Sequence, residues 1–119
     1  MRYMLMCCFN EDRWASLAEP ERAAIMRDYG AWVAGTVKSG QHLATGKLQP
    51  TSAATTVRMR NGKPVITDGP FAETKEQLGG YHLLECANFD EAIALAQRIP
   101  TLPAGGTVEV RPLEPGEHS

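Results

Sequence analysis

The sequence lacks the features that mark several broad classes of protein. No apolar run approaches the roughly 18–20 residues that a membrane-spanning helix requires. Lysine and arginine total 12 against 14 acidic residues, a net charge of −2, whereas nucleic-acid-binding domains usually carry a strong basic excess. The hydrophobic fraction of 43% is enough for one core. We therefore expect a single soluble domain over residues 1–113 with a tail at 114–119, and neither nucleic acid nor membrane as a partner.

Cysteine is scarce, and its pattern argues against export. The three residues are Cys7, Cys8 and Cys86, whereas secreted disulfide frameworks use even counts at wider spacings. The apolar run at 4–9 is too short for a signal peptide and precedes no small-residue cleavage site. A reducing cytoplasm is the expected location, with the cysteines packed in the core. No His or Cys pair has metal-ligand spacing, so no metal is expected.

The first third of the chain predicts a strand followed by a long helix. Residues 2–9 alternate as a strand, but both faces are apolar, so each face must be covered. Pro20 and apolar residues at helical spacing predict a helix over 20–39, after a polar connector at 10–19. Gly30 and Gly35 within that helix indicate close packing onto a sheet.

The rest of the chain predicts short strands, a hairpin and a second helix. Asn61-Gly62 is a strong hairpin signal. Asn88, with Glu91 three residues later, has the spacing of a helix cap, and Pro100 ends that helix. One helical turn is expected at 73–77. The predicted strands cover residues 42–49, 55–60, 64–67, 77–86 and 107–112.

This order of elements predicts an α+β fold. With the hairpin set aside, a split βαβ pair remains, which is the ferredoxin-like arrangement. Right-handed crossovers place both helices on one face of an antiparallel sheet. The other face, carrying Tyr3 and Leu5 or Met4 and Met6, would be left bare, which is rare in a monomer for an apolar surface of several hundred Å². We therefore predict a homodimer packed sheet to sheet.

The densest cluster of reactive side chains lies between the hairpin and the following strand. A carboxylate and a histidine are the usual general acid and base, so Asp68 and His82 are candidate catalytic residues. Asp68 could instead cap its own turn, and His82 could be a core or interface histidine. Gly79-Gly80 permits a close backbone approach or a bulge. The candidate ligand-binding residues are Gly69, Pro70, Phe71, Glu73, Lys75, Tyr81 and Arg111.

Two cations on strands could hold an anionic ligand in a central cavity of the dimer. These are Lys47 and Arg111, although cross-strand pairing with Glu109 or Glu85 accounts for them equally well. The sequence identifies no cofactor, and a haem or flavin stays open because cavities in this fold type arise from packing rather than from a motif. His118, in the tail, is given no role.

The segment Asp68 to Glu76, DGPFAETKE, resembles the signature of the YCII-related family, in the branch named for its Asp-Gly-Pro-Phe motif. The start at residues 1–5, the sequence Gly79-Gly80-Tyr81 and the ending at 105–112 are similar to the same branch. The resemblance covers essentially the whole chain. It implies a ferredoxin-like fold of the dimeric α+β barrel type, in bacterial cytoplasmic proteins that often have no assigned activity.

The resemblance leaves three functions open. The first is a small-molecule binding or regulatory module with its ligand near Asp68 to Phe71. The second is a small enzyme using Asp68 and His82 in acid/base roles on a small organic substrate. The third is an accessory protein in an extracytoplasmic-function sigma-factor circuit, because some relatives are encoded with, or fused to, such factors.

One catalytic pair of the wider family does not carry over to this chain. Shorter YCII-like proteins resemble small enzymes with a proposed His/Asp pair. The helix position expected for that histidine holds Tyr29 here, and the Asp-Pro that ends the second helix in those proteins is Ile99-Pro100. The resemblance therefore implies no His/Asp dyad at these positions.

Overall fold

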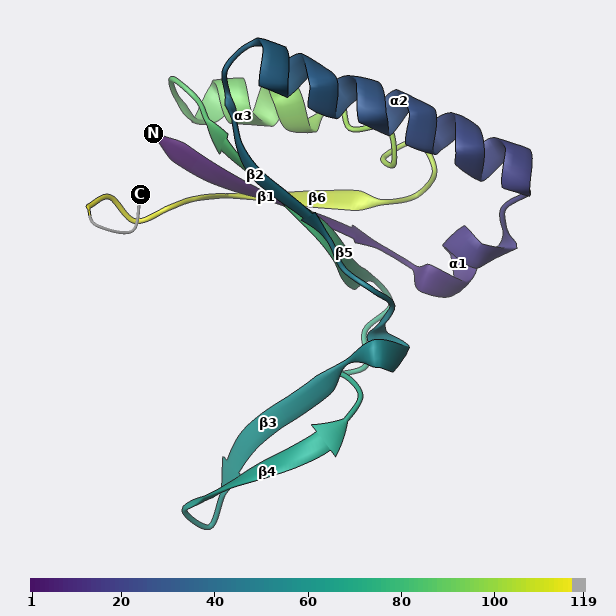
Figure 1. Cartoon of the computed structure of the whole chain (residues 1–119), viewed down its shortest axis with the longest axis vertical. Coiled ribbons are helices and arrows are strands. Elements are labelled where there is room, and N and C mark those ends of the chain that lie inside the picture. The colour runs from purple at the N-terminus through teal and green to yellow at the C-terminus, as the bar shows by residue number, and fades with distance from the viewer. Residues whose placement is uncertain (117–119) are drawn as a thin grey trace.

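The structure is a computed structural model that describes residues 1–116 of the chain. Figure 1 shows a sheet with helices on one side and a separate hairpin that projects away from it. The helices are α1 (Glu11–Ser16), α2 (Glu19–Lys38) and α3 (Phe89–Ala96), with a 3-10 turn, η1 (Thr51–Ala53). The strands are β1 (Arg2–Phe9), β2 (His42–Lys47), β3 (Thr55–Arg60), β4 (Lys63–Asp68), β5 (Gln77–Glu85) and β6 (Thr107–Pro112).

Two antiparallel sheets make up the β structure of the described residues. The larger has the strand order β2-β5-β1-β6, whereas within residues 1–116 β3 and β4 pair only with each other. Asn61 and Gly62 join β3 to β4 with φ angles of 52° and 77°, the left-handed conformation of a type I′ hairpin turn. The predicted α+β class and the hairpin are therefore confirmed. Within residues 1–116, no helix is both long and apolar enough to span a membrane.

The predicted strands and the first predicted helix agree with the structure to within two residues. The second predicted helix starts as expected but ends at Ala96 rather than just before Pro100, and two other predicted segments are wrong. The connector at 10–19 contains α1, because the Asn10 side chain accepts a hydrogen bond from the Arg13 backbone N–H at 2.9 Å and caps a helix. No helical turn forms at 73–77, where an irregular segment leads into β5 at Gln77.

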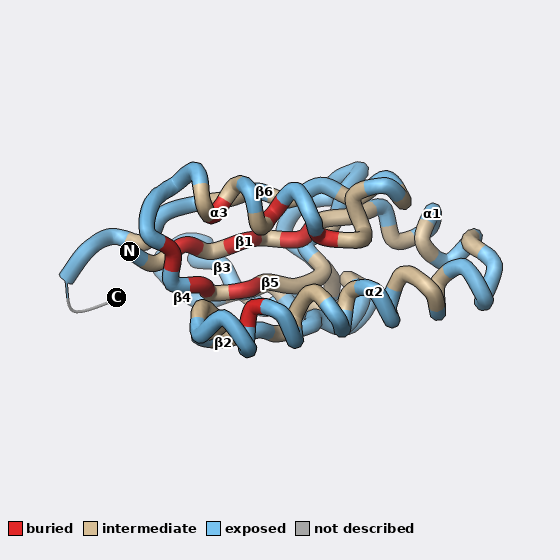
Figure 2. Tube along the Cα trace, turned by 90° about the horizontal axis from the view of Figure 1, so that it is seen from above, coloured by how far each residue is buried: buried red, intermediate tan, exposed pale blue. Residues whose placement is uncertain are grey.

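The core lies between the larger sheet and α2 and α3. Tyr3, Leu5 and Cys7 point from β1 toward the helices and are buried, which identifies the face of this strand that meets them. Figure 2 shows the buried positions concentrated along β1, β5 and α3. The buried apolar cluster consists of Tyr3, Leu5, Cys7, Leu84, Cys86, Ala92, Ala96 and Ile99.

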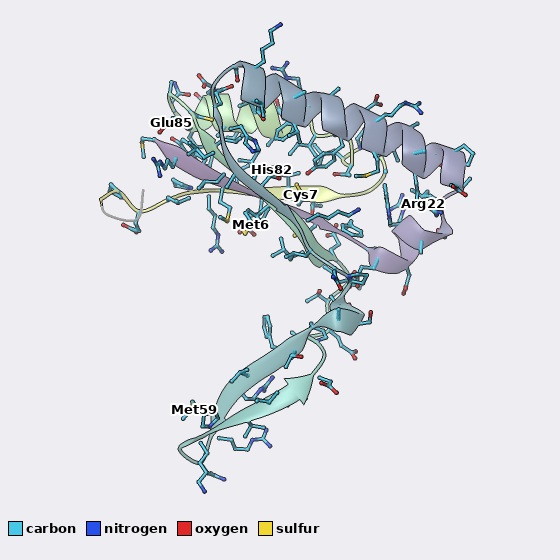
Figure 3. The ribbon with its side chains drawn as sticks, in the orientation of Figure 1. Met6, Cys7, Arg22, Met59, His82 and Glu85 are labelled. Carbon is cyan, nitrogen blue, oxygen red and sulfur yellow. The ribbon has the colours of Figure 1, made fainter. Side chains whose placement is uncertain are left out.

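The opposite face of this sheet has no helix over it among the elements described (Figure 1). Met4 and Met6 of β1 lie across from Leu83 and Tyr81 of β5, and Leu78 continues the same face. We call these five residues the uncovered face. Figure 3 shows Met6 on the side of the sheet away from α2.

The chain exposes more surface than a compact monomer of its mass. Its accessible surface is 8149 Å², whereas a folded monomer of 13.0 kDa exposes about 6,300 Å². Its radius of gyration is 16.3 Å, compared with about 13.5 Å for a compact domain of this length. The projecting hairpin and the uncovered face account for the open shape.

The glycines behave differently in the helix and in the sheet. A Cβ atom at Gly30 or Gly35 would meet nothing within 4 Å, so the expectation that these glycines allow close packing is wrong. For Gly79-Gly80 in β5, the expected bulge and close backbone approach are confirmed. The register with β1 shifts between Cys7 and Cys8, opposite these two glycines. A Cβ at Gly80 would lie 2.9 Å from the backbone oxygen of Gly46 in β2. Close approach of backbones therefore occurs between strands, not under the helix.

Candidate functional site

A row of four hydrogen-bonded side chains crosses the interior between α2 and the sheet. The Tyr29 hydroxyl on α2 lies 3.2 Å from the Cys7 sulfur and contacts His82 Nε2. His82 Nδ1 lies 2.8 Å from Thr45 Oγ1, and these two residues are direct neighbours across β2 and β5. Figure 3 shows Cys7 and His82 on the helix side of the sheet.

The hydrogen bond that Thr45 donates determines which group is the donor in each of the other bonds. Thr45 Oγ1 donates to the backbone carbonyl of Tyr81 at 3.1 Å, so it accepts a hydrogen bond from His82 Nδ1–H. A neutral imidazole then has a bare Nε2, which accepts from the Tyr29 hydroxyl. Because the Tyr29 hydroxyl proton is already donated to His82, the Tyr29 oxygen accepts a hydrogen bond from the Cys7 thiol. The row therefore runs from Cys7 to the Tyr81 carbonyl with every proton assigned.

Burial keeps this row uncharged. His82 is 3% exposed, and its desolvation, with a smaller effect of nearby His42, lowers its pKa to about 4. Burial likewise raises the pKa of the Tyr29 hydroxyl. The pKa of the Cys7 thiol is raised mainly by burial. At neutral pH all three groups are therefore uncharged: the thiol and the phenol keep their protons, and the imidazole carries only one.

Aromatic packing holds the histidine in place. The Trp32 ring lies 4.8 Å from the His82 ring at 60°, an edge-to-face arrangement. Tyr29 and Trp32 are three residues apart on α2, so they share its inner face. Trp32 Nε1 donates to the Leu95 carbonyl at 3.0 Å, which links α2 to the end of α3. Two helices and two strands thus fix the position of His82.

A cavity of about 320 Å³ lies beside this row, and Cys7, Tyr29, Thr45 and His82 are part of its wall. Its other walls come from β1, α1, α2, β2, β5 and the loop before β6. The remaining lining residues are Phe9, Asn10, Arg13, Trp14, Met26, Gly46, Lys47, Gly79, Gly80, Thr101, Ala104, Gly105 and Gly106.

The charged side chains among the described lining residues of this cavity all have one sign. Arg13 and Lys47 line it, and no aspartate or glutamate is among its described lining residues. Neither cation has an ion pair or a side-chain hydrogen bond within residues 1–116. The Arg13 guanidinium rests against Gly105, where a Cβ would lie 2.5 Å from Nη1. Two unpaired cations beside an apolar chamber with a neutral polar wall suit an organic molecule carrying a negative charge.

Of the predicted site residues, His82 lines this cavity and Asp68 does not. Asp68 is the last residue of β4, pairs with Thr55 across the hairpin, and is exposed. Its carboxylate makes no hydrogen bond or ion pair in the described part of the chain. The structure therefore does not bring Asp68 and His82 together within one chain.

The predicted ligand residues of the Asp-Gly-Pro-Phe segment also lie outside the cavity. They occupy the link between β4 and β5, where Gly69 has a φ of 96° and Phe71 is 80% exposed. The other predicted ligand residues of this link, all exposed, are Pro70, Glu73 and Lys75.

The two predicted ligand residues on strands are occupied elsewhere. Tyr81 belongs to the uncovered face and packs over Gly46, where a Cβ would lie 2.6 Å from its ring. Arg111 makes an exposed ion pair of 2.7 Å with Glu109 two positions earlier on β6. The alternative that Arg111 pairs with Glu109 is thus correct, although the pair lies within one strand. Lys47, the other cation considered, does line the cavity.

Arg13, Trp14 and Tyr29 line the cavity but were not predicted as site residues from the sequence. The first two lie on α1, which had a usable signal, since Asn10 precedes two acidic residues in the pattern of a helix start. Tyr29 had a signal from the resemblance, because it stands at the helix position where a histidine is expected. Nothing in the spacing of Cys7, Tyr29 and His82 indicates that they meet.

In comparisons with known proteins, the chain matches a family model and a relative over nearly its whole length. The family model described as the YCII-related domain matches residues 1–116. An uncharacterized protein of Rhizobium meliloti (strain 1021) is 40% identical over 121 residues, covering 98% of each chain.

A solved structure is similar over nearly the whole chain. It is the 5-chloro-2-hydroxyhydroquinone dehydrochlorinase of Burkholderia phenoliruptrix AC1100 in complex with 2,5-dihydroxybenzoquinone. The TM-score is 0.58 at 14% identity, covering 99% of this chain and 98% of the other. At that identity the likeness shows a shared fold alone.

Proposed function

The chain belongs to the YCII-related domain family, and from the geometry of its cavity we propose that the protein binds a small organic anion. One observation carries the proposal: Arg13 and Lys47 face a largely apolar cavity that has no acidic residue among its described lining residues. An unpaired cation beside apolar surface gains most from an anion that brings its own apolar body.

The size and walls of the cavity restrict the ligand further. About 320 Å³ is at the small end of ligand pockets, so one ring with short substituents fits. Phe9, Trp14 and Met26 offer aromatic and thioether surface to such a ring. The anionic group would lie toward Arg13 and Lys47, with the opposite end of the ring toward Tyr29.

Benzoate is expected to bind about 10-fold or more tighter than benzamide, which has the same shape without the charge. The preference arises from Arg13 and Lys47, so it should be lost in an Arg13→Gln/Lys47→Gln double variant. Calorimetric titration, or NMR shifts of the Tyr29 and His82 rings, measures both affinities.

Arg111→Gln is the matched control for this titration. It removes one exposed cation that lies outside the cavity, so the preference for benzoate should persist. Equal binding of benzoate and benzamide by the unmodified protein would contradict the proposal. So would a preference that depends on Arg111.

We also propose that the protein is a cytoplasmic homodimer of the ferredoxin-like, dimeric α+β barrel type. The strand order β2-β5-β1-β6 supports this type, because the first and third strands of the split βαβ pair are central. The surplus of about 1,800 Å² over a compact monomer is in the range that each partner of an obligate dimer buries. Three free thiols are in keeping with a reducing compartment. A sigma-factor partner stays a prediction from the resemblance.

A second candidate function is an enzyme in which Tyr29 and His82 move a proton. Tyr29 Oη donates its proton to His82, so toward a ligand it can act only as a hydrogen-bond acceptor. The Cys7 thiol that now donates to Tyr29 Oη is a weak donor, and a ligand hydroxyl can displace it. The ligand O–H bond would break toward Tyr29 Oη as the tyrosine proton passes to His82 Nε2. The electron pair stays on the ligand oxygen. In this candidate Tyr29 replaces Asp68 as the partner of His82.

The enzyme candidate predicts a preference for a hydroxyl at the inner end of the ligand. We expect 4-hydroxybenzoate to bind about 10-fold tighter than 4-methoxybenzoate, and Tyr29→Phe to abolish the difference. Affinities come from titration, and the ultraviolet spectrum of the bound phenol reports whether its proton is shared. Equal affinities for 4-hydroxybenzoate and 4-methoxybenzoate, in both the unmodified protein and Tyr29→Phe, would contradict a role of Tyr29 in the reaction. The proposal that the cavity binds an organic anion would still stand.

A further inference from the structure

The hairpin formed by β3 and β4, residues 55–68, has two faces of opposite character. We call this hairpin the arm. Its register pairs Val57 with Ile66 and Met59 with Pro64, and these residues share one face because side chains alternate along a strand. The cations Arg58, Arg60 and Lys63 lie on the other face. The arm is therefore an amphipathic ribbon.

The apolar face of the arm is open to solvent in a single chain. Val57 is 64% exposed, Met59 65% and Ile66 72%. Figure 3 shows Met59 far from the larger sheet, near the tip of the arm. A two-stranded hairpin alone is marginally stable in water, so an arm with a bare apolar face needs a surface to pack against.

The root of the arm is anchored, which gives the arm a defined direction. The Glu11 carboxylate on α1 accepts hydrogen bonds from the Thr51 backbone N–H at 3.0 Å and from its hydroxyl at 2.5 Å. On the other side of the root, Gly69 N–H donates to the Ala54 carbonyl at 2.7 Å, and the Thr56 hydroxyl donates to the Gly69 carbonyl at 2.7 Å. The bonds of Glu11 tie the start of the arm to α1, and the bonds of Gly69 hold the two ends of the arm together.

We propose that the apolar face of the arm packs on a second copy of this chain, next to the paired uncovered faces. The inference rests on the proposed sheet-to-sheet dimer. The arm projects beyond the sheet on the side away from the helices (Figure 1). If two uncovered faces meet, each arm must pass alongside the other copy, and a two-fold axis makes this contact reciprocal.

The charges of the chain favour a second copy as the occupant. The arm carries three cations and Asp68, a net charge of +2, while the whole chain carries −2. The rest of the chain therefore carries −4, so the arm of one copy and the body of the other attract each other. The surplus surface of a single chain is also large enough for an interface that includes both the uncovered face and an arm.

Ile66→Lys tests the arm, and Thr67→Lys is the matched control. Both variants add one charge to the same strand, but residue 67 lies on the opposite face. We expect Ile66→Lys to weaken the dimer about 10-fold or more, and Thr67→Lys to leave it unchanged within about two-fold. Sedimentation velocity over a range of protein concentrations gives the dissociation constants, and circular dichroism checks that both variants are folded.

Hydrogen exchange on the unmodified protein separates the arm from the sheet-to-sheet dimer. If both are right, amides of β3 and β4 become protected at concentrations where the dimer forms. A dimer that retains its affinity in Ile66→Lys and has unprotected arm amides overturns the arm contact but keeps the dimer. A monomer at all concentrations overturns both. Arm protection that depends on added lipid vesicles rather than on protein concentration assigns the arm to a membrane and overturns the proposal.

Discussion

Acidification from about pH 7 to about pH 4 is expected to lower the free energy of unfolding by up to about 3 kcal/mol through His82 alone. The buried imidazole has a pKa lowered to about 4, whereas the unfolded chain has the ordinary value of 6.5. Below 6.5 the unfolded state binds a proton that the folded state resists, so stability falls as the pH falls. The loss is complete only below the folded-state pKa. Urea unfolding at a series of pH values measures it.

His82→Gln isolates this effect from the titration of carboxylates. The variant loses stability at neutral pH, because it disturbs a buried hydrogen-bonded row. It cannot take up the extra proton, so the stability difference between the two proteins should shrink by about 3 kcal/mol on acidification. A difference that stays constant with pH would show that His82 is not held neutral by burial.

Gly80→Ala is expected to destabilise the fold by about 2–3 kcal/mol, the upper range for overpacking. The added Cβ would lie 2.9 Å from the Gly46 backbone oxygen, and the strands that carry these two residues are hydrogen-bonded neighbours. A side chain could rotate away, but a backbone oxygen moves only if the strand moves. Because both glycines line the cavity, the substitution should also weaken benzoate binding.

Gly30→Ala is the matched substitution, and it is expected to raise the free energy of unfolding instead of lowering it. The position is exposed in the middle of α2, and a Cβ there would meet nothing within 4 Å. Alanine should therefore stabilise the protein by about 1 kcal/mol through helix propensity and a less flexible unfolded chain. Chemical denaturation of both variants measures whether each substitution raises or lowers the free energy of unfolding. Equal effects at the two positions would contradict the packing described between β2 and β5.

The candidate site shows where reasoning from sequence reached its limit. Asp68 and His82 are close in sequence and chemically suited to each other, yet the arm and the larger sheet place them in different parts of the chain. The partners of His82 are Tyr29 and Thr45, 53 and 37 residues away along the chain. No local pattern records such a contact, since it depends on how α2 crosses β5.

The sequence by itself determined the strands, the hairpin and the two longer helices and their order, because hydrophobic periodicity, caps and turn residues act within a few positions. Asn88, Pro20 and the Asn61-Gly62 turn each specified local backbone geometry, and the α+β class followed from the elements that they delimit. Only the tertiary structure decided which face of β1 is buried, that Arg13 and Lys47 share one cavity, and that the arm stands away from the sheet. Those outcomes depend on packing between distant segments, and a side chain's burial and neighbours exist only once the segments have met.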